Sequence, residues 1–295
     1  MPSHKDNHLI TGTTKLTGLL GSPVSHSISP LMHNEAYRLL GLDYVYLCFD
    51  VKDQDLAAAV KGLRICGIHG FNLTMPNKNR ITELVDALSP AASLIGAANT
   101  VVREKDGSFT GHNTDGIGYI RALEAEGCPI AGMEVTLLGG GGAAAAIVTQ
   151  AALDRAGAIH VFLRPSSRFY GRMCTLAQKL CACTPCTVDI HSLENEKDLA
   201  QSIGRSGLVI NATSVGMADQ SHESLIRDPA LFRPGLVVSD VIYNPRRTRL
   251  LKEAAAAGCR TFNGMNMLLY QGAEAFRLWT GQDMPTDPIR EKYFS

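Results

Sequence analysis

Residues 134–153 read EVTLLGGGGAAAAIVTQAAL, a hydrophobic strand pattern that runs directly into four glycines and then into an alanine-rich helical pattern. A strand, a glycine turn and a helix in this order are typical of a nucleotide-binding βαβ unit. The glycines let the backbone approach a pyrophosphate, and the helix N-terminus offers N–H groups to it. The spacing is G-x-G-G-A rather than G-x-G-x-x-G, so a tight turn that binds nothing is the alternative.

Further strand patterns follow this turn, separated by helical patterns, at 159–163, 188–190, 208–211 and 236–241. The alternation predicts a βαβ series with a mostly parallel sheet. No Asp or Glu occurs between residues 155 and 188, where an NAD site usually carries an acid for the ribose hydroxyls. Three arginines stand there instead: Arg164, Arg168 and Arg172. Arginine suits the 2′-phosphate of NADP, and a solvated helix face is the alternative.

The chain before residue 117 also alternates strand and helix patterns. Strands are expected at 16–20, 45–51, 68–74, 100–103 and 108–111, the last two joined by an Asp106-Gly107 hairpin turn. Helices are expected at 28–40, at 56–63, at 76–88 behind Pro76, and from Ser89-Pro90 onward. One last amphipathic helix is expected after Gly264.

The bulk composition limits the class of protein. The chain has 295 residues, enough for two domains, and Lys+Arg and Asp+Glu are equal at 28 each. This neutral balance argues against a dedicated nucleic-acid binder. No apolar run reaches the roughly 18 residues that span a bilayer, and residues 1–15 lack the apolar core of a signal peptide. We therefore expect a cytoplasmic protein without membrane contact.

Eight cysteines are present, and four of them cluster: Cys174, Cys181, Cys183 and Cys186. A structural zinc site usually needs two well-spaced pairs, and Cys181 and Cys183 would point to different sides of a helix. We expect reduced thiols and no metal site.

Four short polar segments lie outside the glycine turn, at 25–30, 72–78, 98–100 and 113–116. Ser27 and Ser29 stand just before a helical stripe, where hydroxyl and N–H groups can hold a carboxylate. Lys78 lies beside a turn, and Asp115 ends an extended segment. Taken singly, each residue is equally consistent with a cap, an Asx-turn or a surface side chain.

Together, these segments resemble one family, the shikimate dehydrogenases, and in particular its bacterial quinate/shikimate dehydrogenase branch. The resemblance runs from about residue 16 to about residue 285. It rests on SHSISP (25–30), NLTMPNK (72–78), GAANTV (96–101), NTDG (113–116), LGGGGA (138–143), NATSVGM (211–217), VIYNP (241–245) and GMNMLLYQGA (264–273). The MPNK form and the ending LWTG (278–281) favour the quinate/shikimate branch.

The resemblance implies an NAD(P)-dependent oxidoreductase that interconverts 3-dehydroshikimate and shikimate, and in the same way 3-dehydroquinate and quinate, in aromatic amino-acid biosynthesis or quinate metabolism. It implies an α/β fold with a substrate domain, residues 1–116 with 265–295, completed by a C-terminal helix, and a Rossmann domain, residues 117–264. The catalytic pair would be Lys78 and Asp115. The substrate would be bound by Ser27, Ser29, Thr74, Asn99 and Gln271. The pyrophosphate of the cofactor would be held by Gly139, Gly140, Gly141, Gly142 and Ala143, and Arg164 would also bind the cofactor. The nicotinamide side would be lined by Thr213, Val241, Tyr243 and Gly264.

One stretch departs from the family pattern. Leu163-Arg164-Pro165-Ser166 stands where the family shows Asn-Arg and a polar residue, and Pro165 removes one N–H donor. Dual-specificity relatives carry an Asp that favours NAD at the place of Ser166, so NADP is the expected cofactor and NAD the alternative. The expected partners are small molecules, with the chain a monomer or homodimer. Competing interpretations are a non-catalytic shikimate-binding regulatory relative, a methylene-tetrahydrofolate dehydrogenase and an amino-shikimate enzyme.

Overall fold

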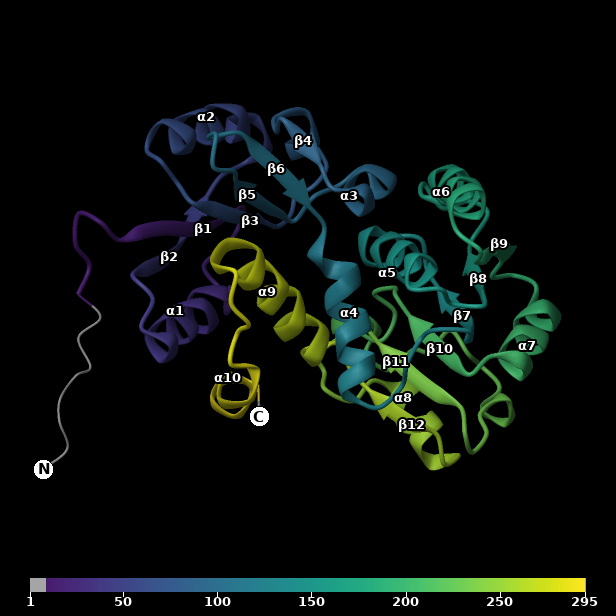
Figure 1. The fold of residues 1–295 in the computed structure, drawn as a ribbon. Helices are drawn as coiled ribbons and strands as arrows, with labels where there is room; N and C mark the ends of the chain where they lie inside the picture. Colours follow the sequence, from purple (N-terminus) through teal and green to yellow (C-terminus); the bar gives the residue numbers. More distant parts are fainter. Residues whose placement is uncertain (1–8, 295) are drawn as a thin grey trace, which may run out of the picture. The chain divides into compact units, whose positions relative to one another are not determined.

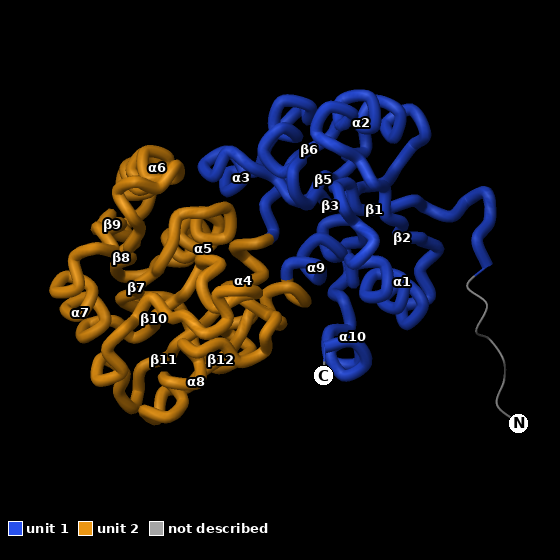
Figure 2. Tube along the Cα trace, turned by 180° about the vertical axis from the view of Figure 1, so that it is seen from behind, with its two compact units in different colours: residues 1–114, 271–295 blue, residues 115–270 orange. Residues whose placement is uncertain are grey.

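The structure is a computed structural model that describes residues 9–294. The chain divides into two compact units (Figure 2). The first holds the residues up to Thr114 together with those from Gln271 on, and the second is Asp115–Tyr270. The domain bounds expected from the sequence, 116/117 and 264/265, fall in or directly before the same two helices, α4 (Thr114–Ala125) and α9 (Met265–Thr280).

A six-stranded mixed sheet forms the centre of the first unit (Figure 1). In spatial order its strands are β2 (Tyr44–Asp50), β1 (Lys15–Gly21), β3 (Gly70–Leu73), β5 (Thr100–Arg103), β6 (Phe109–His112) and β4 (Ala87–Leu88). Strand β1 is parallel to β2 and β3, whereas β5 is antiparallel to both β3 and β6. The hairpin between β5 and β6 was predicted from Asp106-Gly107, and Gly107 has the positive φ of 86° that suits a tight turn.

Helices pack against this sheet to form two apolar cores. They are α1 (Ser29–Leu40), α2 (Leu56–Ile65), α3 (Pro90–Ile95), the second part of α9 and α10 (Thr286–Tyr293), with the 3-10 turns η1 (Asp53–Asp55) and η2 (Arg80–Glu83). One core joins α2 and η2 to the sheet around Phe71 and Phe109. The other joins α1 and α9, where the ring of Tyr37 lies 5.2 Å from that of Phe276. The indole N–H of Trp279 donates to the carbonyl of Val101 at 3.0 Å and so fixes α9 to β5.

The helix predicted over 76–88 is not present. Residues 80–83 form only η2, and residues 87–88 form strand β4. The amide of Asp86 donates to the carbonyl of Phe109 at 2.9 Å, and its carboxylate accepts from the amide of Phe109 at 2.7 Å. These bonds hold the segment at the sheet edge beside β6, so long-range pairing overrides the local helical pattern.

The second unit is built on a six-stranded parallel sheet. In spatial order its strands are β9 (Thr187–Ser192), β8 (Ala158–Leu163), β7 (Glu134–Leu138), β10 (Leu208–Asn211), β11 (Val237–Asp240) and β12 (Arg260–Phe262). Numbered along the chain from β7, this is the order 3-2-1-4-5-6 of dinucleotide-binding folds. The other elements of this unit are α4, α5 (Gly142–Leu153), α6 (Tyr170–Cys183), η3 (Ala218–Gln220), α7 (Glu196–Arg205), η4 (Pro229–Leu231), α8 (Arg249–Ala256) and the first part of α9.

The predicted α/β class with a Rossmann-type unit is confirmed. Besides β4, the elements that were not expected include α4, which precedes β7, and two elements near the end of the chain. Strand β12 adds a sixth strand beside β11, and α10 follows the helix that was expected to be the last. Lys292 of α10 pairs with Glu35 of α1 at 3.1 Å. Among residues 9–294, no helix combines the length and the apolar character needed to cross a membrane.

Candidate active site

In the first unit, two predicted substrate residues lie next to strand ends that meet at one edge of the sheet. The amide of Thr74, directly after β3, donates to the carbonyl of Leu20 in β1 at 3.0 Å. The amide of Leu73 donates to the carbonyl of Asn99, directly before β5, at 2.8 Å. The parallel and antiparallel registers of β1, β3 and β5 therefore bring Thr74 and Asn99 to the same edge.

Asn99 is buried and its side chain ties this edge to the start of α4. Its Oδ1 accepts hydrogen bonds from the amide of Thr114 at 2.7 Å and from the hydroxyls of Thr114 and Thr100 at 3.1 Å each. Asp115 is the next residue after Thr114 and begins the second unit. The orientation of the Asn99 amide is thus fixed by protein groups before any substrate binds.

A buried network of hydrogen bonds, which the sequence did not reveal, holds the backbone of Asn99 in place. The Nδ2 of Asn72 donates to the carbonyl of Asn99 at 3.1 Å and to the hydroxyl of Thr100 at 2.9 Å, and the hydroxyl of Tyr46 donates to Asn72 Oδ1 at 2.8 Å. Burial raises the pKa of Tyr46 well above its usual value, and a hydrogen bond with Ser29 acts in the opposite direction. The network therefore links Ser29, one of the two serines predicted to hold a carboxylate, to Asn99.

Ser27 and Ser29 lie at the N-terminus of α1. Ser29 is the first residue of α1, and Ser27 directly precedes the capping residue Ile28. The amide of Ser29 donates to the hydroxyl of Ser27 at 3.2 Å, so the two serines lie together at the helix start. The capping position, Ile28, supplies no side-chain hydrogen bond to the helix. A helix start with two hydroxyls and no capping carboxylate suits an external anion.

Lys78 lies in the loop after β3, and its backbone is anchored beside Asn99. Its carbonyl accepts from the amide of Ala98 at 2.9 Å. The loop is further held by the buried Asn77, whose Nδ2 donates to the carbonyl of Val51 at 2.8 Å.

Gln271 lies on α9 next to Gly272, where a side chain would collide with Met32 of α1.

The second unit brings the predicted pyrophosphate residues to the start of α5. Gly139 has φ of +119°, and a Cβ there would lie 2.8 Å from the carbonyl oxygen of Ala212. A Cβ at Gly140 would lie 2.6 Å from Leu163. Gly141 and Gly142 have nothing within 4 Å of a Cβ position, so both Cβ positions at the helix start face open space. The first two glycines are required by packing, whereas the next two leave room for a ligand.

Arg164 is exposed and directly follows β8. It lines a cavity of about 550 Å³, together with apolar side chains that include Leu193, Val215 and Ile226. The guanidinium of Arg168 stacks over the ring of Phe169 at 4.8 Å instead. The cavity also carries carboxylates, at Glu194, Glu196, Glu223 and Asp228. The lining thus combines apolar side chains with four carboxylates and two arginines, Arg164 and Arg227, and Arg164 is the one predicted from the sequence to meet the 2′-phosphate of NADP.

A second buried network positions the predicted nicotinamide-side residues. The amide and hydroxyl of Thr213 donate to Asn211 Oδ1 at 3.1 and 2.7 Å, and Asn211 Nδ2 donates to Asp240 Oδ1 at 3.1 Å. Burial raises the pKa of Asp240, and its hydrogen bonds with Ile242, Thr248 and Asn211 act in the opposite direction. Asn211 and Asp240 are polar residues at the ends of two buried strands, and that position is the sequence signal by which both could have been predicted.

Val241 and Gly264 lie beside this second network. The amide of Val241 donates to the carbonyl of Asn211 at 3.0 Å, and a side chain at Gly264 would collide with the carbonyl of Val241. Tyr243 is half exposed. Thr213, Val241 and Gly264 therefore gather at the carboxyl ends of β10 and β11, where ligands bind in folds of this strand order.

Known proteins match the chain over nearly its whole length. The family model for the shikimate dehydrogenase substrate binding domain matches residues 19–101, and that for the shikimate 5'-dehydrogenase C-terminal domain matches residues 264–292. A Listeria monocytogenes protein named shikimate dehydrogenase (NADP(+)) is 47% identical over 292 residues, which are 99% of this chain and 100% of the relative.

Two solved structures extend the comparison to the fold. Shikimate 5-dehydrogenase from Listeria monocytogenes, in complex with shikimate and NAD, is 48% identical with a TM-score of 0.93, over 96% of this chain and 97% of that one. Quinate dehydrogenase from Corynebacterium glutamicum, in complex with NAD, is 31% identical with a TM-score of 0.83, over 95% and 99%. These matches in sequence and fold show that the chain belongs to the shikimate dehydrogenase family.

Proposed function

We propose that the chain catalyses the reversible, NADP-linked oxidation of shikimate to 3-dehydroshikimate, with quinate as a second substrate. The observation that carries this proposal is the anchored edge of the first unit. There the loop that bears Lys78 is hydrogen-bonded to Ala98, and the side chain of Asn99 is fixed by Thr114. The names of the relatives support the choice of substrate and cofactor.

In this proposal, Ser27 and Ser29 bind the substrate carboxylate with their hydroxyls and with the N–H groups at the start of α1. Thr74, Asn99 and Gln271 bind the ring hydroxyls. Because Asn99 is held by three hydrogen bonds of its own, little side-chain entropy is lost when it binds a hydroxyl.

Lys78 and Asp115 are the proposed catalytic pair. Oxidation of a carbinol removes a hydride from carbon and a proton from oxygen, and the nicotinamide supplies the hydride acceptor. Lys78 receives the hydroxyl proton or stabilises the developing alkoxide, and Asp115 orients the lysine and hydrogen-bonds the substrate. In the reverse direction Lys78 returns the proton to the carbonyl oxygen or stabilises the same charge there, and Asp115 again orients the lysine.

The strand order of the second unit supports a dinucleotide site, and so does the open space around the Cβ positions of Gly141 and Gly142 at the start of α5. Gly139, Gly140 and Ala143 complete the pyrophosphate turn, and Arg164 pairs with the 2′-phosphate. Thr213, Val241, Tyr243 and Gly264 bind the nicotinamide side. Residues 1–116 with 265–295 act as the substrate domain and residues 117–264 as the cofactor domain, in a cytoplasmic monomer or homodimer.

A steady-state assay of shikimate and quinate against NADP and NAD tests this function. We expect the highest kcat/KM for shikimate with NADP. Turnover of neither acid by a protein that still binds shikimate would overturn the proposal in favour of a non-catalytic, shikimate-binding regulatory protein. A higher kcat/KM with NAD than with NADP would contradict the proposed role of Arg164.

A further inference from the structure

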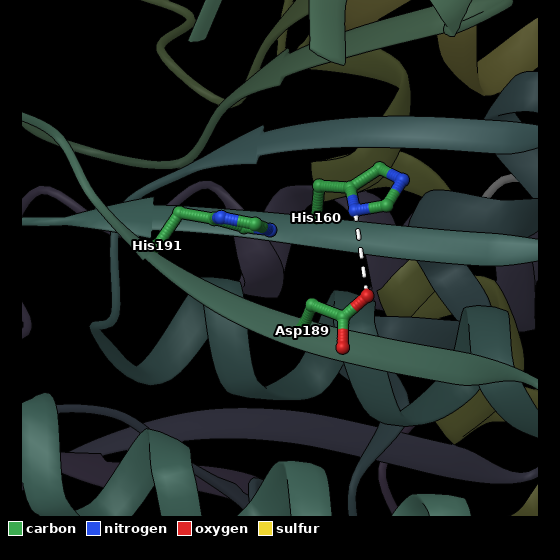
Figure 3. Close-up of side chains that lie close together, drawn as sticks. All are labelled: His160, Asp189 and His191. Atoms are coloured by element: carbon green, nitrogen blue, oxygen red, sulfur yellow. Dashed lines mark ion pairs between the residues drawn. The ribbon is translucent and has the colours of Figure 1, made fainter. Parts of the chain in front are cut away.

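Three side chains that can bind a metal lie together on β8 and β9 of the second unit (Figure 3). They are His160, Asp189 and His191. In the parallel register of these strands His160 lies opposite Asp189, and Phe162 lies opposite His191. Because side chains alternate between the faces of a sheet, residues two apart share one face, and all three side chains lie on the same face. Their ligand atoms are within 4.8 Å of one another.

The hydrogen bonds of His160 leave one of its nitrogens facing a carboxylate. Its Nε2 lies 3.0 Å from Glu134 Oε1, which also accepts from Arg205 at 2.9 Å. Since a carboxylate only accepts, Nε2 carries the proton, and a neutral ring then has its lone pair on Nδ1. That Nδ1 is buried without a hydrogen-bond partner among the described residues, and Asp189 Oδ2 lies 3.7 Å away. His160 itself is only 7% exposed.

His191 presents a second nitrogen of the same kind. Its ring stacks on Phe162, with 4.8 Å between centroids and 16° between planes, and its centroid lies 5.6 Å from that of His160. Its Nε2 is also buried and has no hydrogen-bond partner within residues 9–294. A second proton on His160, at Nδ1, would give that nitrogen an ion pair with Asp189 but would leave Nε2 of His191 without a partner among the described residues. One cation between the three groups satisfies all of them.

We propose that His160, Asp189 and His191 bind a divalent transition-metal ion of the zinc class. Two imidazoles and one carboxylate match the ligand preference of Zn²⁺, whereas Mg²⁺ and Ca²⁺ favour sites made of oxygen atoms alone. Glu134 supplies the carboxylate that metal-bound histidines usually contact with their other nitrogen. The cysteine cluster considered from the sequence takes no part in this site.

The site can close on an ion with small side-chain movements. Metal–ligand bonds of about 2.0–2.1 Å in a tetrahedral centre place the ligand atoms about 3.4 Å apart. In this structure the ligand atoms of the three residues lie within 4.8 Å of one another, so they must move slightly closer together. The Asp189 side chain is 49% exposed, so it can rotate inward. An ion, and a water as fourth ligand, can enter from the solvent that this side chain contacts. The bound ion would fasten the edge strand β9 to β8.

The test is zinc titration of the full-length protein after treatment with a chelator, followed by calorimetry and by melting temperature. We expect one Zn²⁺ per chain, and a Tm increase of about 5–10 °C at zinc one hundred times above Kd. Co²⁺ in place of zinc should give the visible absorption of a tetrahedral site.

Matched variants separate this site from adventitious binding. Asp189→Asn keeps the shape of the side chain, and His191→Phe keeps a ring against Phe162, and each should weaken zinc binding by at least about 10-fold. The exposed His222, changed to Asn, serves as the control and should leave Kd unchanged. Absence of binding, or equal binding in all four proteins, would overturn the proposal. Calorimetry, melting temperature and Co²⁺ absorption are all independent of dehydrogenase activity.

Discussion

His33 makes the stability of the first unit depend on pH. This residue of α1 is fully buried, its ring stacks on Tyr46 at 4.4 Å with 5° between planes, and both its nitrogens lack a hydrogen-bond partner among the described residues. Burial lowers the pKa of His33 from 6.5 to about 3. The native protein therefore holds a neutral imidazole at pH 7, and also at pH 5, where the unfolded chain is protonated.

The sign and size of the effect follow from this difference in pKa. Above pH 6.5 His33 is neutral in both the folded and the unfolded state, so its protonation does not change the free energy of unfolding there. As pH falls below 6.5 the unfolded chain takes up a proton that the native state refuses until about pH 3, so the free energy of unfolding decreases across that window. At pH 5 the loss is about 2 kcal/mol, from 1.36 kcal/mol per pH unit.

Urea unfolding at pH 7 and pH 5 measures this loss. Trp279 is the only tryptophan in the chain, and its ring centroid lies 5.3 Å from that of His33, so its fluorescence reports unfolding of this unit. The test variant is His33→Phe, which keeps a ring against Tyr46 and removes the titrating group. Wild type should lose about 2 kcal/mol more than the variant between the two pH values. Burial also lowers the pKa of His69 and His112, but these groups are present in both proteins and cancel.

Phe276→Leu is the control for a change in core packing without a change in titration. It should lower stability by a similar amount at both pH values, because it alters the same cluster but no ionisable group. Equal pH dependence in wild type and His33→Phe would refute the reasoning.

The other predictions concern the proposed active site. Changing both Ser27 and Ser29 to Ala should raise KM for shikimate about 10–100-fold through two lost charge-assisted hydrogen bonds; an unchanged KM would remove them from carboxylate binding. Lys78→Ala should lower kcat about 10²–10⁴-fold with a much smaller change in KM, and its combination with Asp115→Asn should cost less than the sum of the two. A near-normal kcat, or full additivity, would contradict the catalytic pair. Arg164→Ala should weaken NADP more than NAD in a nucleotide-fluorescence titration, and equal weakening would argue against contact with the 2′-phosphate.

Local patterns predicted most of the fold, and long-range pairing explains the failures. The strand, glycine turn and helix at 134–153 lie where they were expected, because period, turn and helix start are all encoded within twenty residues. The segment 76–88 has an equally helical pattern, but Asp86 is held by Phe109, 23 residues away. A sequence window does not contain that partner.

The same distinction applies to the candidate site. Residues in short motifs, such as Ser27 and Lys78, could be singled out because their neighbours in sequence make the motif. The role of Asn72 could not be predicted although it belongs to the same motif as Lys78, and Tyr46 lies in no motif, since their hydrogen bond joins residues 26 positions apart. A polar residue inside a strand is a weak signal until its partner is known.

The attachment of α9 to the first unit bears on the order in which the chain acquires its structure during synthesis. Trp279 and Val101 are joined by a hydrogen bond across 178 residues. A ribosome that adds about 5–20 residues per second needs about 10–40 s to make the intervening chain. The N-terminal part of the first unit therefore leaves the ribosome before the residues of α9 that complete its core have been made. The whole of Asp115–Tyr270 is synthesised in the interval and can fold during that time. The unit that starts the chain is completed last, and a nascent-chain binding factor would find its apolar sheet face exposed for that time.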